Sequence, residues 1–332
     1  MTRTVLFREL GGPEVLKVED ADPGTPGPGE VLIRVDAVGV NRAEALFRSG
    51  NYIETVRRYP ARLGTEAAGV VEALGEGVAG LRVGEPVSTV PSFSPNDYGV
   101  YAERAIVPAR AVVPRPEGVG PVEGAAVWMP YVTAYGALVE VGGMRPGDTV
   151  VLNAASSSVA LAAIQVAERV GATPIALTRT EAKKDAILKA GAAEVIVTDT
   201  EDVVERVLAA TGGRGAEYVF DAVAGPGITD LAKVVADEGT HLVYGGLSGA
   251  PTPYPGFELG MPALNIRTYT LHETTRRPER LRRAVAFVNS GLRTGAFRPA
   301  VDRTFDLEDV VDAHRHLEGN SQFGKIVLTV AQ

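Results

Sequence analysis

The sequence predicts an α/β protein of two domains, in which a β-rich, barrel-like part precedes a parallel sheet wound with helices on both faces. Short apolar runs separated by Gly and Pro turns fill the chain up to about residue 123. From about residue 124, such runs alternate with stretches of helical periodicity, which is typical of a doubly wound parallel sheet. A chain of 332 residues is also long for a single core.

In the first part, apolar and charged residues alternate over 30–40, which predicts a half-exposed strand. A helical pattern over 41–48 follows and ends near Gly50, because glycine commonly terminates helices. Further short runs predict strands at 4–7, 15–18 and 69–74.

The stretch from Thr149 to Thr180 is the most informative part of the second domain. An apolar run at 149–152 is followed by small residues, a helical pattern over 159–170 and a second apolar run at 174–177. Strand, tight turn, helix and strand in this order form the first half of a dinucleotide-binding unit. The amides at the start of such a helix can bind a pyrophosphate, and the helix dipole favours its charge.

The turn inside this stretch reads Ala-Ala-Ser-Ser-Ser-Val and lacks the G-x-G-x-x-G pattern of many dinucleotide sites. Serine can still allow close approach, and its hydroxyl can donate to phosphate. We therefore expect the pyrophosphate to bind at Ser156, Ser157, Ser158 and Val159. The alternative is a small-residue turn that only packs the strand against the helix.

The end of the second strand distinguishes NAD from NADP. Sites for NAD have a carboxylate there that accepts from the ribose 2′-hydroxyl, whereas an arginine can bind a 2′-phosphate. Here the chain has Thr178 and Arg179, followed by Lys183, and no carboxylate precedes Glu181. We expect Thr178, Arg179 and Lys183 to contact the cofactor, which we expect to be NADPH. A solvated basic turn is the alternative interpretation.

The rest of the second part continues the alternation of helices and strands. Helices are predicted at 132–141, 183–190, 203–210, 278–290 and 307–318. Strands are predicted at 194–197, 218–223, 241–246, 266–271 and 324–330. Asp221 falls at the end of the fourth strand of the sheet and Gly245 and Gly246 at the end of the fifth, on the carboxyl edge where such sheets bind ligands.

The composition excludes several classes of protein. Without cysteine there is no disulfide, thiolate nucleophile or Cys-based zinc site. All four histidines fall late in the chain, and His314 and His316, two apart in a predicted helix, do not share a face, which disfavours a histidine metal site. No G-x-S-x-G motif accompanies them, which disfavours a serine hydrolase. A net charge of −8 without a basic block disfavours nucleic acid and anionic membranes as partners. No long apolar span or signal-peptide pattern occurs, so we expect a cytoplasmic location.

Several short motifs occur in a characteristic order along the chain. They include GTEAAGVV at 64–71, GEGV at 75–78, TAY at 133–135, RPGD at 145–148 and GKIVL at 324–328. Together they resemble the medium-chain dehydrogenase/reductase superfamily over nearly the whole chain. The resemblance implies a GroES-like, barrel-type catalytic domain formed by 1–123 and 272–332, and a Rossmann cofactor-binding domain at 124–271.

Thr65 stands where the zinc-dependent members of that superfamily carry a metal-binding histidine, and their cysteine ligands are missing. The chain is therefore similar to the zinc-independent branch, which contains quinone oxidoreductases and 2-enoyl thioester reductases, and no metal ligand is expected. The resemblance implies NADPH-dependent transfer of hydride to a quinone or to the β-carbon of an α,β-unsaturated carbonyl. It also places Asp221, Gly245 and Gly246 on the nicotinamide side, and we assign Lys325 to the cofactor site.

The segment from Asn41 to Tyr52 resembles the one that lines the active cleft in both groups. Quinone reductases often have tyrosine at two of its positions, which here hold Leu46 and Tyr52. In the enoyl thioester reductases the tyrosine that matches Tyr52 is thought to deliver a proton. We expect Tyr52 to donate to the substrate carbonyl, with Asn41 and Thr133 as further polar candidates.

Two other functions remain open. The missing glycines and Leu46 are compatible with a non-catalytic nucleotide-binding or regulatory protein on the same fold. A tailoring reductase for a larger secondary metabolite is also possible, because function depends on the site and not on the fold. We expect a small-molecule substrate, and a homodimer because relatives often pair through the edge of the nucleotide-binding sheet.

Overall fold

The computed structural model describes residues 1–259, 261 and 263–331, and the chain divides into two compact units. Unit 1 comprises residues 1–129 and 289–332, and unit 2 comprises residues 130–288. The sequence-based boundaries at 123/124 and 271/272 assign residues 272–288 to the barrel-type part, whereas the structure includes them in unit 2. The helix at 278–293 provides the reason, since its Arg283 pairs with Glu140.

Unit 1 contains two sheets in the part of the chain that the structure describes. The larger has the order β15-β16-β3-β5-β6-β8, with β7 also paired to β3, and the smaller has the order β2-β1-β4. The strands are β1 (Thr2–Phe7), β2 (Lys17–Ala21), β3 (Glu30–Val40), β4 (Ala61–Arg62), β5 (Ala67–Leu74), β6 (Pro86–Thr89), β7 (Arg104–Pro108), β8 (Val112–Pro114), β15 (Val301–Asp306) and β16 (Lys325–Thr329). The helices are α1 (Arg42–Ser49), α2 (Pro121–Gly124) and α10 (Val310–Glu318).

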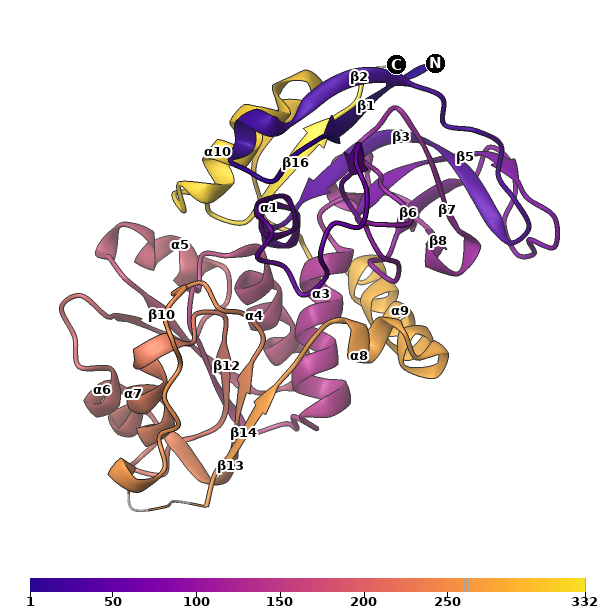
Figure 1. Ribbon diagram of the computed structural model, residues 1–332. Helices are drawn as coiled ribbons and strands as arrows, with labels where there is room; N and C mark the ends of the chain where they lie inside the picture. The colour runs from indigo at the N-terminus through magenta and orange to yellow at the C-terminus, as the bar shows by residue number, and fades with distance from the viewer. Residues whose placement is uncertain (260, 262, 332) are drawn as a thin grey trace. The chain divides into compact units, whose positions relative to one another are not determined.

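Strand β3 is the centre of the larger sheet, since it pairs with β5, β7 and β16, all antiparallel. The pairing of β16 places Ile326 opposite Val40, so the start of β16 lies beside the end of β3 (Figure 1). Gly39 is required there, because a Cβ on it would meet the carbonyl oxygen of Ala125 at 2.1 Å. This close approach brings residues far apart in the sequence into one buried cluster.

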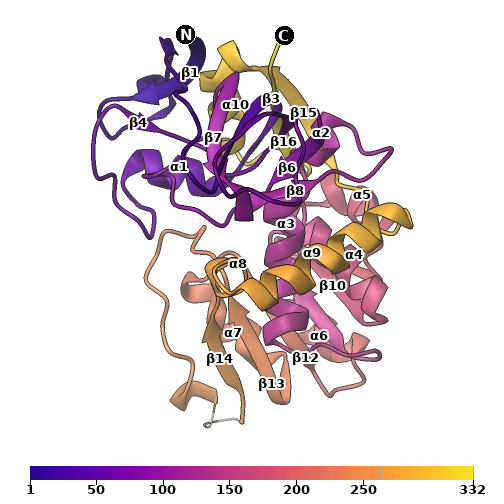
Figure 2. The same cartoon turned by 90° about the vertical axis from the view of Figure 1, so that its right-hand side faces the viewer.

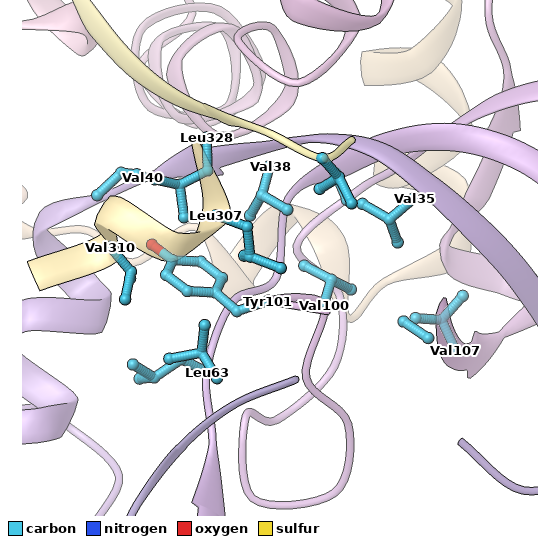
Figure 3. Packing of buried hydrophobic residues seen from close by; sticks show 14 of the residues in the cluster. Val35, Val38, Val40, Leu63, Val100, Tyr101, Val107, Leu307, Val310 and Leu328 are labelled. Atoms are coloured by element: carbon cyan, nitrogen blue, oxygen red, sulfur yellow. The ribbon is translucent and has the colours of Figure 1, made fainter. Parts of the chain in front are cut away.

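The apolar core of unit 1 lies between β3, the start of the chain and α10. Figure 3 shows the ring of Tyr101 packed among aliphatic side chains that include Leu63, Leu307 and Val310. Tyr101 is 1% exposed, and burial raises the pKa of its hydroxyl well above the ordinary value. Tyr101 is therefore a core residue of this unit.

Unit 2 is a parallel sheet with helices along it, and within the described residues its strand order is β11-β10-β9-β12-β13-β14. The strands are β9 (Thr149–Leu152), β10 (Thr173–Thr178), β11 (Glu194–Val197), β12 (Ala216–Asp221), β13 (Val235–Val243) and β14 (Asn265–Thr268). The helices are α3 (Trp128–Ala134), which begins in unit 1, a π-helix (Tyr135–Val141), α4 (Ser158–Val170), α5 (Lys184–Lys189), α6 (Val203–Ala210), α7 (Ile228–Lys233), α8 (His272–Thr275) and α9 (Pro278–Arg293), which continues into unit 1. Helices α6 and α7 lie side by side (Figures 1 and 2).

The predicted fold class is confirmed, and several predicted elements have the bounds that the structure shows. Residues 149–152, 194–197 and 203–210 match β9, β11 and α6. Strand β13 ends at Val243, so Gly245 and Gly246 follow the strand and lie in the loop beyond it. The two-residue β4 and the strands β6, β7 and β8 were not predicted, because runs of two to five residues carry little periodicity. No helix among the described residues is long and apolar enough to cross a membrane.

Candidate functional site

The carboxyl edge of the parallel sheet in unit 2 gathers most residues expected to bind the cofactor. The strand order reverses between β9 and β12, and dinucleotides bind across such a reversal. Residues 156–159 follow β9, Thr178 ends β10, Asp221 ends β12, and Gly245 and Gly246 follow β13. The turn at 156–159, the segment that follows Thr178 and the Asp221 carboxylate therefore lie on one edge of the sheet.

The turn after β9 allows a ligand to approach the backbone closely. Ala154 has φ 47°, and Ser157 caps helix α4 by accepting from the amide of Ala160 at 3.2 Å. A helix has no internal acceptor for its first amides, which here belong to Ser158 and Val159. Because the turn carries no side chain larger than valine, its residues fit a pyrophosphate.

Basic groups stand at the β10 side of this edge. The ammonium of Lys183 donates to Ser156 Oγ at 3.1 Å, which joins the segment after β10 to the turn after β9. Arg179 directly follows β10 and is exposed. None of the three residues from Thr178 to Thr180 carries a carboxylate. An arginine and a lysine in this position complement a phosphate on the adenosine ribose.

Asp221 is fully buried and connects three segments of the edge. Its Oδ1 accepts from the Asn153 amide after β9 and from the backbone amides of Val223 at 2.7 Å and Ala224 at 2.9 Å. Its Oδ2 lies 3.0 Å from His241 Nε2 on β13. Burial by itself would raise the pKa of Asp221, but these hydrogen bonds outweigh it and the pKa lies below its ordinary value. The carboxylate is therefore ionised near neutral pH.

The loop held by Asp221 has a strained backbone. Ala224 has φ 54° and ψ −147°, a region that only glycine adopts without cost. The loop also binds the segment after β13, since the amide of Leu247 donates to Ala222 O at 3.1 Å. A Cβ on Gly245 would meet Ala222 O at 2.5 Å, whereas a Cβ on Gly246 would meet nothing within 4 Å. The missing side chain at Gly245 thus permits the two loops to pack against each other. The space beside the Cα of Gly246 is open.

Sequence reasoning missed three residues at this edge: Asn153, His241 and Tyr244. Each follows or interrupts an apolar strand run, and a polar residue in such a run was the signal that could have identified them. The Tyr244 ring stacks on Phe220 with centroids 4.0 Å apart, and burial raises the pKa of its hydroxyl.

Unit 1 holds a second buried polar cluster, around Lys325. Its ammonium donates to Glu66 Oε2 at 2.6 Å and to Asn41 Oδ1, and both Lys325 and Glu66 are at most 1% exposed. Glu66 Oε1 accepts from the amide of Met129 at 2.9 Å. The ammonium of Lys325, which we expected at the cofactor, is therefore engaged inside unit 1.

Asn41 is the N-cap residue of α1 and is 7% exposed. Its Nδ2 donates to Gly39 O at 3.1 Å and to Glu66 Oε2 at 3.3 Å, so both amide protons are used within unit 1. Its backbone amide donates to Glu44, where burial raises the carboxyl pKa to about 7. The side-chain oxygen of Asn41 accepts from Lys325, and the capping box of α1 also directs the Asn41 side chain at the backbone amide of Glu44.

The other catalytic candidates have different environments. Tyr52 is half-buried and contacts Phe47 edge-on, with centroids 6.4 Å apart. Leu46 lies on α1 and is 37% exposed. Thr133 is 6% exposed on α3 and belongs to unit 2, whereas Tyr52 and Asn41 belong to unit 1.

No group of three or more His, Cys, Asp or Glu residues that could hold a metal ion occurs in the described part of the chain. Thr65, which the sequence resemblance matches to the zinc-binding histidine, is 9% exposed. Its hydroxyl is buried and has no hydrogen-bond partner among the described residues.

A barrel-type unit joined to a dinucleotide-binding sheet with this edge is typical of oxidoreductases that use a nicotinamide dinucleotide. The family described as "Alcohol dehydrogenase GroES-like domain" matches residues 27–117, and the family described as "Zinc-binding dehydrogenase" matches residues 190–328. The chain belongs to the medium-chain dehydrogenase/reductase superfamily, in its quinone oxidoreductase branch. It is an NAD(P)H-dependent reductase of the quinone oxidoreductase type.

Individual relatives support this placement over the full length. The quinone oxidoreductase of Lama guanicoe is 31% identical, covering 99% of this chain and 97% of its own. A 2-haloacrylate reductase of a Burkholderia species is 30% identical, covering 99% of each chain. The quinone oxidoreductase of Escherichia coli, crystallised with NADPH, superposes with a TM-score of 0.90 at 27% identity, covering 98% of this chain and 99% of that one.

Proposed function

We propose that this protein is an NADPH-dependent reductase that transfers hydride to a quinone or to the β-carbon of an α,β-unsaturated carbonyl. The observation that carries the proposal is the edge of unit 2, where Lys183 binds Ser156 at the phosphate-type turn and Arg179 follows β10. Relatives named for a quinone and for a haloacrylate, an unsaturated acid, represent the two substrate classes.

Bound NADPH supplies the hydride from C4 of its nicotinamide ring. Hydride addition at the β-carbon places negative charge on the carbonyl oxygen of the substrate, and a proton must then be added at the α-carbon. We assign donation to that oxygen, and delivery of the proton, to the Tyr52 hydroxyl. Asn41 is a second polar candidate, and its two amide protons are engaged by Gly39 O and Glu66. Thr133 is a further polar candidate from α3.

The experiment that tests this function uses NADPH deuterated at C4 with a panel of quinones and enones. The reductase proposal predicts NADPH oxidation, with deuterium at the β-carbon of the enone product. NADPH binding without oxidation across the panel would instead favour the non-catalytic regulatory protein. Turnover only with bulky polycyclic enones would favour a tailoring reductase.

Replacement of Arg179 with alanine is expected to raise the Kd for NADPH about tenfold or more, because a hydrogen bond to a charged group is worth about 1.5–3 kcal/mol. The Kd for NADH should stay unchanged, since NADH lacks the 2′-phosphate. Fluorescence titration of each nucleotide measures both constants. Arg214→Ala is the matched control, because Arg214 is an exposed arginine of the same unit that lies away from this edge. An equal effect of both variants on NADPH would contradict the assignment.

We also propose that two copies pair through the edge of the parallel sheet. Among the described residues, strand β14 is the outermost strand on its side of the sheet, and the segment before it exposes large apolar side chains at Leu247, Tyr254, Phe257 and Met261. An unpaired strand edge beside exposed apolar groups favours association. Sedimentation velocity measures the state directly, and a monomer at micromolar concentration would reject the proposal.

A further inference from the structure

His241 is a buried polar residue that the proposed chemistry leaves without a role. It lies on β13, is 0% exposed, and is followed by apolar Leu242 and Val243. Its Nε2 is 3.0 Å from Asp221 Oδ2. Because an ionised carboxylate only accepts hydrogen bonds, His241 donates from Nε2, and the ring is oriented by this bond.

Stability alone is a poor explanation for this histidine. Its Nδ1 is buried without a partner among the residues that the structure describes. A buried polar atom without a partner is destabilising, so the histidine carries a cost at Nδ1 that its bond to Asp221 must offset. The position of β13 inside the sheet, between β12 and β14, makes an apolar residue the default.

The bond to Asp221 has a geometric consequence. Asp221 Oδ1 holds the amides of Val223 and Ala224, and Ala224 has the strained φ of 54°. Backbone conformations of this kind persist only where surrounding contacts over-determine them. Since His241 binds the other carboxylate oxygen, it fixes the direction in which Oδ1 faces those amides.

This loop belongs to one half of the sheet. In the order β11-β10-β9-β12-β13-β14, the half from β9 to β11 carries the pyrophosphate turn and the basic residues of the adenosine side. The half from β12 to β14 therefore faces the nicotinamide side of a bound dinucleotide. Asp221 ends β12, so the loop after it lies on the nicotinamide side.

We propose that His241 is a positioning residue for the nicotinamide half of the dinucleotide, acting through Asp221 on the loop at 222–225. The proposal rests on the proposed function, because it takes the ligand to be a nicotinamide dinucleotide. Loss of the His241 hydrogen bond should loosen this loop and leave the adenosine side of the edge unchanged.

The test compares His241→Met with His241→Gln, two side chains of equal length of which only glutamine can donate to Asp221. Isothermal titration measures the Kd of NADPH and of 2′,5′-ADP, which lacks the nicotinamide half. We expect the methionine variant to bind NADPH about tenfold more weakly, because the loosened loop must then be ordered when the nicotinamide half binds. It should bind 2′,5′-ADP as the wild type does. The glutamine variant should retain most of the NADPH affinity.

His314→Met is the matched control. His314 is also fully buried, but it lies on α10 in unit 1 and contacts Tyr101 in the core. It should leave both dissociation constants unchanged. Equal weakening of NADPH and 2′,5′-ADP in His241→Met, or no weakening of either, would overturn the positioning role. Failure of the wild type to bind NADPH would overturn the proposed function itself, so the two failures are distinguishable.

A measurement on the unaltered protein covers the case in which His241→Met does not fold. With 15N-labelled histidine, the ring resonances of His241 should shift more on NADPH binding than on 2′,5′-ADP binding, because only NADPH contacts the nicotinamide side. Equal shifts with the two ligands would contradict the proposal.

Discussion

Replacement of Lys325 with methionine is expected to lower the free energy of unfolding by about 3–5 kcal/mol, the usual cost of removing one partner of a buried ion pair. The ammonium of Lys325 is the cation beside Glu66, which is 0% exposed. Without it, the Glu66 carboxylate stays in the core with the hydrogen bonds from Asn41 and the amide of Met129 but no paired cation among the described residues. Urea-induced unfolding followed by circular dichroism measures the loss.

The double variant Lys325→Met/Glu66→Gln is the control for this prediction. It removes both charges, and the glutamine oxygen can still accept from the amide of Met129. Removing both members of a buried pair is often close to neutral, so the double variant should recover most of the lost stability. If the double variant is as unstable as Lys325→Met, the loss comes from packing around the lysine side chain and not from the unpaired carboxylate.

Replacement of Asp221 with alanine should have the largest effect on the cofactor site. It leaves four donors without an acceptor, from Asn153, Val223, Ala224 and His241. Since an unsatisfied buried polar group costs about 1–3 kcal/mol, we expect the free energy of unfolding to fall by at least about 3 kcal/mol. The released loop should also weaken NADPH binding by about a hundredfold, which corresponds to about 2.7 kcal/mol.

Asp221→Asn is the matched comparison, because its amide oxygen can still accept from the Val223 and Ala224 amides. Its Nδ2 would face His241, and a neutral histidine can move its proton to Nδ1 and accept at Nε2. We therefore expect Asp221→Asn to cost about 1 kcal/mol, within the range of one hydrogen bond. Unfolding titrations and NADPH titrations of both variants check the ranking, and equal losses would mean that the negative charge matters more than the hydrogen-bond geometry.

The sequence predicted the elements whose local pattern is strong. The β-branched run at 149–152, the small turn and the helical pattern that follows matched β9 and α4 closely, since each is defined by neighbours in the chain. The carboxyl edge was also predictable, because parallel strands in a doubly wound sheet end on the same side. Arg179 and Lys183 were placed there by their position after β10 alone.

The hydrogen-bond partners could not be predicted in this way. Lys325 meets Asn41 and Glu66 only because β16 pairs with β3, and no local pattern encodes a contact between residues 284 positions apart. His241 meets Asp221 because β13 pairs with β12 in parallel, which places His241 opposite Val219, two residues before Asp221. Local propensity and periodicity thus determined the fold class, the strand ends and the candidate cofactor edge. Strand pairing decided which buried charges meet, because a buried charge is stable only beside a partner and that partner comes from a distant part of the chain.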